Sequence, residues 1–198
     1  MLTRIVLLIA LVLPMAAAAQ SLVVSRGVGD SVRIDTGYGS FMNKDSSLNR
    51  EWVIINDPAM PLQIETATVA PTYIQDRVRS RYVYSGRLTM KTGAQAIVAY
   101  EVRMLVLDVF GERQKLLSLS SVGDVAAETS ETAGGSWDLY SSADASTAFY
   151  SIAYVAAVRT ESGQIYRAQL PAVLAEIQKI SANIKASDIE REKPGPTP

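Results

Sequence analysis

Apolar and polar residues alternate with a period of two through much of the chain, which is typical of β-strands with one buried face. The clearest case runs from Arg77 to Met90 and predicts a long amphipathic strand that bends at Gly86. One side of this segment carries Val78, Tyr82, Tyr84, Leu88 and Met90, and the other carries Arg77, Arg79, Arg81, Arg87 and Thr89.

A second alternating segment, residues 96–109, becomes apolar on both sides from Leu105 to Leu107. Strands with two apolar faces are covered by other layers on both sides, so we expect this one to lie centrally. Residues 108–112 then form a turn in which Gly111 takes a positive φ, and residues 115–122 return as the partner strand. The sequence therefore predicts a central hairpin here.

Further strands follow from the same pattern. Residues 148–160 form a third long strand, and a turn at 161–163 pairs it with 164–168. Between these hairpins, residues 123–146 are rich in Ser, Ala, Gly and acids, which predicts an irregular connection holding a short strand near Trp137. Shorter strands are expected at 21–25, 32–36, 52–56 and 62–69, which makes eight or nine in all.

The end of the chain changes to helical periodicity. Pro171 suits a first helical position, and apolar residues recur every three or four positions up to Ile184, which predicts an amphipathic helix over about 171–185. Residues 187–198 are charged and then Pro/Gly-rich, so we expect a disordered tail. The fold class predicted is mainly β: an antiparallel β-sandwich in one domain over 20–186, with the C-terminal helix packed on a sheet or across an open end. Docking on a sheet is preferred, because the two-sided apolar stretch Leu105–Leu107 needs a cover.

The first nineteen residues have the pattern of a secretory signal peptide. Arg4 precedes an apolar run, and the small residues 16–19 lead into polar Gln20, so cleavage is expected near Ala19. The apolar run is too short for a membrane-spanning helix, which needs about 20 residues, and we expect no transmembrane segment in the mature chain. The chain has no cysteine, so a bacterial periplasmic or secreted location is predicted, with a fold that rests on its hydrophobic core.

Three segments together resemble the extracytoplasmic immunoglobulin-like domains of the FxLYD type. They are Tyr84–Leu88, Ala99–Arg103 and Leu107–Gly111, and the resemblance covers about residues 80–122. In those domains one strand leads into a longer strand that ends in an aspartate and a glycine-containing turn. The resemblance implies an immunoglobulin-like β-sandwich and implies no activity.

Composition excludes several kinds of chemistry. With no histidine and no cysteine, this chain has no Ser-His-Asp or Cys-His catalysis and no His-based zinc site. Paired carboxylates remain the general acid/base option, and the acids nearest the central hairpin are Glu101, Asp108, Glu112 and Asp124. A structural role is favoured for two of them: Asp108 hydrogen-bonds the backbone of its own turn, and Glu101 pairs with an arginine across the sheet.

Residues 43–51 carry oxygen ligands of the kind that Ca²⁺ takes, but Lys44 and Arg50 stand among them. A solvated loop is the preferred interpretation, and we expect neither a metal nor a cofactor. The tyrosines could line a ligand groove, although alternating strand positions favour core packing for them: Tyr82, Tyr84, Tyr100, Tyr150, Tyr154 and Tyr166.

The candidate ligand-binding residues are Arg77, Arg79, Arg81 and Arg87, which strand periodicity places on one face. Guanidinium groups match carboxylate and phosphate geometry, so this face could engage an anionic glycan, a lipid phosphate or an acidic envelope protein. The alternative is a solvated face paired with Glu101, Glu51 or Glu65. The formal net charge of −1 gives no general attraction to nucleic acid.

These patterns predict an exported, non-enzymatic binding or accessory protein of the bacterial cell envelope. Two alternatives stay open at this stage. One is a histidine-free glycan hydrolase that uses paired carboxylates. The other is a structural subunit that assembles by strand addition along an exposed edge.

Overall fold

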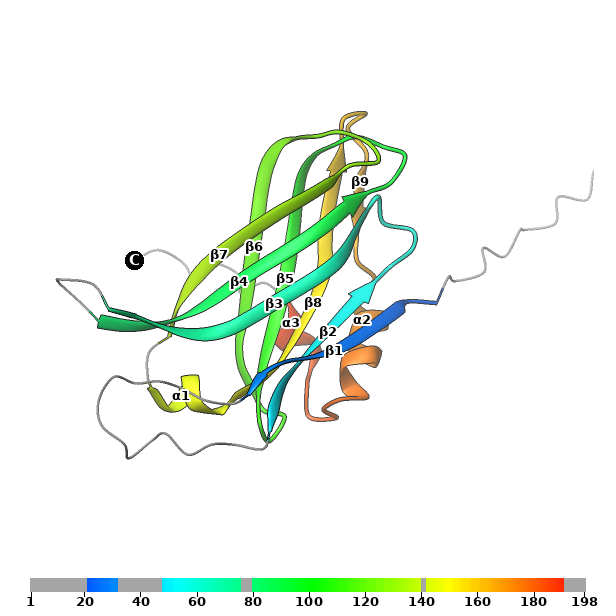
Figure 1. Ribbon diagram of the computed structural model, residues 1–198. Helices are drawn as coiled ribbons and strands as arrows, with labels where there is room; N and C mark the ends of the chain where they lie inside the picture. Colours follow the sequence, from blue (N-terminus) through cyan, green and yellow to red (C-terminus); the bar gives the residue numbers. More distant parts are fainter. Residues whose placement is uncertain (1–20, 32–47, 76–79, 140–141, 191–198) are drawn as a thin grey trace, which may run out of the picture.

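The structure is a computed structural model that describes residues 21–31, 48–75, 80–139 and 142–190, and it is mainly β with two sheets (Figure 1). The predicted strand at 32–36 lies outside these residues. The strands are β1 Val23–Ser31, β2 Asn49–Asn56, β3 Leu62–Gln75, β4 Ser80–Thr92, β5 Ile97–Asp108, β6 Arg113–Val125, β7 Ser130–Leu139, β8 Ala148–Thr160 and β9 Ile165–Arg167. The helices are α1 Ser142–Thr147, α2 Leu170–Gln178 and α3 Ala186–Ile189.

The larger sheet has the strand order β1-β2-β8-β5-β6, with β9 pairing along the end of β8, and the smaller sheet has the order β3-β4-β7. The predicted hairpin of β5 and β6 is confirmed as an antiparallel pair. The prediction of an antiparallel fold is wrong at one place, because β2 and β8 pair in parallel, with Val53 opposite Ile152. These two strands are far apart in the sequence, so no hairpin turn fixes their relative direction.

Two hydrophobic cores lie on opposite faces of the larger sheet. The strand β5 contributes to both, because Met104 and Val106 pack between the sheets while Leu105 and Leu107 pack on the other face beneath the C-terminal helices. The prediction that this segment is covered on both sides is therefore confirmed. The second core joins sheet and helices through Val53, Ile55, Leu105, Leu107, Ile152, Tyr154, Ala156, Val173, Ile177, Ile184 and Ile189.

The predicted docking of the C-terminal helix on a sheet is confirmed, but the helix ends at Gln178 and not at 185. The chain turns after Lys179, where the Ser181 hydroxyl donates to the carbonyl of Gly111 in the β5–β6 turn at 2.8 Å. Ile184 reaches the same core from beyond this turn. The apolar spacing thus predicted the buried face correctly and the helix length wrongly.

The predicted disordered tail is also wrong at its start. Ser187 lies in α3, and Ile189 is fully buried in the core beneath the larger sheet. The carbonyl oxygen of Ile189 accepts hydrogen bonds from Tyr154, at 2.6 Å, and from Arg103, at 3.1 Å. The remainder of the predicted tail, 191–198, lies outside the described residues.

The region predicted as an irregular connection holds the ten-residue strand β7 and the short helix α1. In β7 exposed and less exposed residues alternate, and Trp137 points toward the core. Its ring lies over Gly86 and Gly135, where an added Cβ would come within 2.9 Å of ring carbons. Glycine usually weakens a strand, so the glycine-rich composition of this region predicted an irregular connection. In β7 the glycines instead make room for the indole ring, which is why that prediction failed.

Candidate functional site

The outer face of the smaller sheet, meaning the side turned away from the larger sheet, is rich in short hydroxyl side chains. The register places Thr66, Thr89 and Thr132 in one row across the three strands, and Ser85 beside Ser136 in another. Cations and acids stand among these hydroxyls. The exposed residues of this outer face include Thr66, Thr68, Thr72, Arg81, Ser85, Arg87, Lys91, Ser130, Thr132, Gly134, Ser136 and Asp138.

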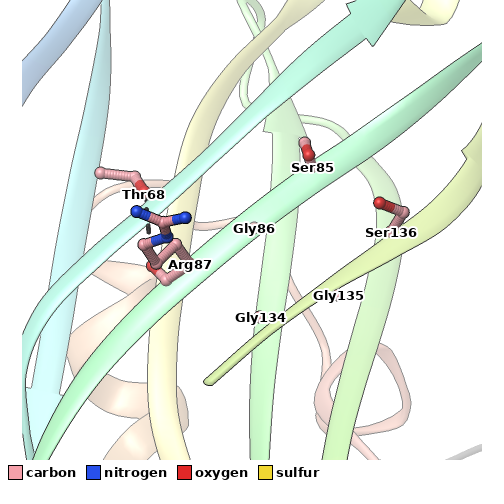
Figure 2. Close-up of a pocket in the computed structure, with 7 residues that line it drawn as sticks. All are labelled: Thr68, Ser85, Gly86, Arg87, Gly134, Gly135 and Ser136. Carbon is pink, nitrogen blue, oxygen red and sulfur yellow. Dashed lines mark hydrogen bonds between the residues drawn. The ribbon is translucent and has the colours of Figure 1, made fainter. Parts of the chain in front are cut away.

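A shallow open hollow of about 520 Å³ lies at the centre of this outer face. It crosses all three strands and is lined by Thr68, Ser85, Gly86, Arg87, Gly134, Gly135 and Ser136 (Figure 2). Figure 2 shows Arg87 and Thr68 at one side, Ser85 and Ser136 at the other, and the glycines between them.

The glycines explain why the surface is hollow here. Gly134 faces outward opposite Arg87, so the edge strand β7 carries no side chain in this row. A Cβ at Gly134 would come within 2.9 Å of the backbone oxygen of Gly86, which leaves no room for a larger residue without a shift of the strands. The hollow is therefore a consequence of close backbone approach between β4 and β7.

Arg87 is exposed, and its guanidinium makes no ion pair with any other described residue. The Thr68 hydroxyl donates to the backbone oxygen of Arg87 at 3.3 Å, which ties β3 to β4 at the edge of the hollow. Within the described part of the chain, the hydroxyls of Ser85 and Ser136 have no hydrogen-bond partner. One free cation and two free hydroxyls therefore surround the hollow.

Two of the four predicted arginines can be placed in the structure, and they share one face of β4. Arg81 lies on the outer face with Arg87, about 20 Å along β4, whereas Arg77 and Arg79 lie outside the described residues. Arg81 forms an ion pair of 2.7 Å with Asp138, and both side chains are more than half exposed, at 52% and 62%. The partner is none of the three acids that the solvated alternative named. Glu101 instead pairs with Arg103 on its own strand at 2.8 Å.

The exposed charges of this sheet are sparse. On the described residues of β3, β4 and β7 they are the cations Arg81, Arg87 and Lys91 and the acids Glu65 and Asp138. Lys91, like Arg87, makes no ion pair with another described residue. Arg87 is therefore the one cation among the residues that line the hollow, where it could pair with one negative group of a ligand.

Three of the four candidate catalytic acids, Glu101, Asp108 and Glu112, make side-chain contacts with neighbouring residues, whereas Asp124 is exposed on β6. Asp108 Oδ1 accepts the backbone N–H groups of Phe110, at 2.9 Å, and Glu112, at 2.8 Å, which confirms the predicted turn contact. The Glu112 carboxylate accepts a hydrogen bond from Asn183. The described residues hold no group of three or more acids that could bind a metal ion, and most of the candidate calcium segment 43–51 lies outside them.

Two buried tyrosines, Tyr84 and Tyr100, join the two sheets, and Tyr84 also borders a small cavity between them. The Tyr84 hydroxyl donates to Gln114 at 2.6 Å, and the Tyr100 hydroxyl donates to Glu131 at 3.0 Å, so each bond crosses from one sheet to the other. Burial is the main cause that raises the pKa of both phenols, and it raises the pKa of Tyr100 to about 12 with help from the hydrogen bond to Glu131. Core packing is thus the correct interpretation for these residues.

Of the seven residues that line the hollow, only Arg87 was predicted as a site residue, and six were missed: Thr68, Ser85, Gly86, Gly134, Gly135 and Ser136. The alternation of residues 130–139 was the signal that could have revealed β7, because its odd positions point inward and its even positions point outward. Across the helices of the described residues, none has the length and apolar composition to span a membrane.

Comparisons with known proteins add little. No protein-family model matches the chain, and no curated protein matches it. A solved structure of a hypothetical protein from Peptoclostridium difficile 630 has 10% sequence identity and a TM-score of 0.40, and the match covers 61% of this chain and 92% of that one. A likeness this distant supports no argument.

Proposed function

We propose that this is an exported, non-enzymatic binding or accessory protein of the bacterial cell envelope, and that it engages an anionic ligand through the outer face of the smaller sheet. The observation that carries the proposal is Arg87, an exposed guanidinium without an ion-pair partner among the described residues, set in a hollow with hydroxyl groups. The proposal that the protein is exported rests on the signal-peptide pattern of residues 1–19.

An exposed arginine can donate two parallel hydrogen bonds to a carboxylate or phosphate. The strands around Arg87 fix the backbone from which it and its neighbours project, since β4 is paired on both sides along the hollow. A site on paired strands loses less conformational entropy on binding than a site on a loop. These features support binding by a preformed surface.

A capture experiment tests the proposal. Tagged protein is used to capture envelope species from crosslinked extract, with Arg87→Glu alongside and Arg159→Glu as a matched control, because Arg159 is exposed on β8 of the other sheet. We expect capture by the wild type and the control and loss of capture in Arg87→Glu, with unchanged melting temperatures. Equal capture by Arg87→Glu would contradict the proposal that the ligand binds to the outer face through Arg87.

The immunoglobulin-like sandwich stays a prediction beside this proposal. The β5–β6 hairpin with its Asp108 turn, and the core between the two sheets, support it. The parallel pair of β2 and β8 argues against it. The hydrolase and strand-addition alternatives also stay predictions.

A further inference from the structure

The outer face offers polar contacts and few apolar ones. The described part of the chain exposes several large hydrophobic residues, but none of them lies on β3, β4 or β7: Val23, Val28, Leu48, Phe110, Val122 and Ile165. Protein interfaces depend on buried aromatic and aliphatic anchors, and lipid chains need apolar surface. The hollow therefore suits a polar ligand better than a protein or an acyl chain.

The hollow combines one cation with groups that both donate and accept hydrogen bonds. Ser85 and Ser136 have hydroxyls of this kind on the side opposite Arg87. Sugar hydroxyls have the same double capacity, whereas the oxygens of a phosphate dianion only accept. An acidic sugar carries one carboxylate among several hydroxyls, so it matches a hollow that carries one guanidinium among hydroxyls.

The shape of the hollow lets a ligand extend beyond it. Its lining residues come from three adjacent strands and it is open to solvent, so a chain can pass through without ending there. Lys91 lies on the same side of β4, about 13 Å from Arg87, and offers a second positive charge to an extended chain.

We infer that the hollow binds one uronic-acid residue within an extended acidic glycan, with the sugar carboxylate on Arg87 and sugar hydroxyls on Ser85 and Ser136. This inference rests on the proposed function and names the ligand class of the same site. A single exposed charge pair contributes little, so the glycan binds through several residues and a free uronic acid binds much more weakly than an oligomer.

Titration calorimetry with the mature protein tests the inference. The probes are oligogalacturonate, oligoguluronate and hyaluronan oligosaccharides, with methyl-esterified oligogalacturonate and inorganic phosphate as comparisons. We expect at least one acidic oligomer to bind, and Arg87→Gln to weaken that binding roughly tenfold or more. If the oligomer bound is oligogalacturonate, its methyl esterification should abolish binding. If another oligomer is bound, carboxyl esterification of that oligomer replaces this comparison.

A second pair of variants tests the hydroxyls without touching the charge. Ser136→Ala removes a hydroxyl inside the hollow, and Ser130→Ala removes one from the same outward side of β7 outside it. We expect weaker oligomer binding in the first variant and unchanged binding in the second. Equal affinities in both would overturn the contact with Ser136.

The outcomes separate this inference from the proposed function. If none of the three oligomers binds while Arg87→Glu still abolishes capture from envelope extract, the inference of a uronic-acid ligand is overturned. The proposal that the outer face binds an envelope species is then supported. The inference of a uronic-acid ligand is also overturned if phosphate binds as tightly as the oligomers, or if an esterified oligomer binds as well as the free acid. If there is neither oligomer binding nor Arg87-dependent capture, both proposals fall.

Discussion

The indole nitrogen of Trp137 donates a hydrogen bond of 3.1 Å to the carbonyl oxygen of Ser118 and so joins an edge of the smaller sheet to an edge of the larger one. The same indole covers Gly86 and Gly135 from the core side. The outer side of these glycines lines the hollow. The same glycines therefore make room for the tryptophan on the core side and line the hollow on the outer side.

Adding a methyl group at Gly135 should destabilise the protein. The new Cβ would stand 2.9 Å from the Trp137 ring, and such overpacking costs about 1–3 kcal/mol. The control is Gly123→Ala on β6, where no atom lies within 4 Å of the added Cβ and no loss of stability is expected. Urea unfolding of both variants measures the difference, and equal midpoints would contradict the packing described here.

Ile189→Ala should lower the free energy of unfolding strongly, although only nine residues of the sequence follow Ile189. Its side chain is fully buried, and truncation of such an isoleucine costs about 2–5 kcal/mol. Ile165→Ala is the matched control, because Ile165 is 53% exposed and should change the free energy of unfolding by less than about 0.5 kcal/mol. A stable Ile189→Ala variant would show that α3 does not dock.

Stability should fall in alkaline solution because the buried tyrosines resist ionisation. The pKa of Tyr100 rises from 10.0 to about 12 in the folded protein, so the unfolded chain loses this proton first. The contribution is fully present below pH 10 and is lost as the pH rises towards about 12. Unfolding free energies measured across this range should fall less steeply in Tyr100→Phe, and an unchanged slope would contradict the prediction.

Releasing Arg81 from its partner should strengthen anion binding with little effect on the fold. Asp138→Asn removes the carboxylate of the exposed ion pair, which contributes at most about 1 kcal/mol to stability. Arg81 then becomes a further free cation on the outer face. We expect tighter binding of the acidic oligomer that the wild type binds and a nearly unchanged melting temperature. Weaker binding would mean that the carboxylate assists the ligand.

Local patterns were sufficient for much of the scaffold. The alternation of residues 96–109 and 148–160 predicted two long strands, and the double apolar face at Leu105–Leu107 predicted cover on both sides. Asp108 and Gly111 predicted their turn, in which Gly111 has a φ of 81°. These predictions were correct because each depends on side-chain periodicity or on the backbone preference of a neighbouring residue.

By itself, then, the sequence determined which segments form most of the strands, which faces of them are buried, and that Arg81 and Arg87 share a face. Only the tertiary structure decided how distant segments meet: β2 parallel to β8, Ile189 beneath the larger sheet, and the hollow between Thr68 and Ser136. The physical reason is that periodicity fixes the face of a side chain within its own strand. Its neighbours across the sheet depend on register, which comes from the packing of the whole fold.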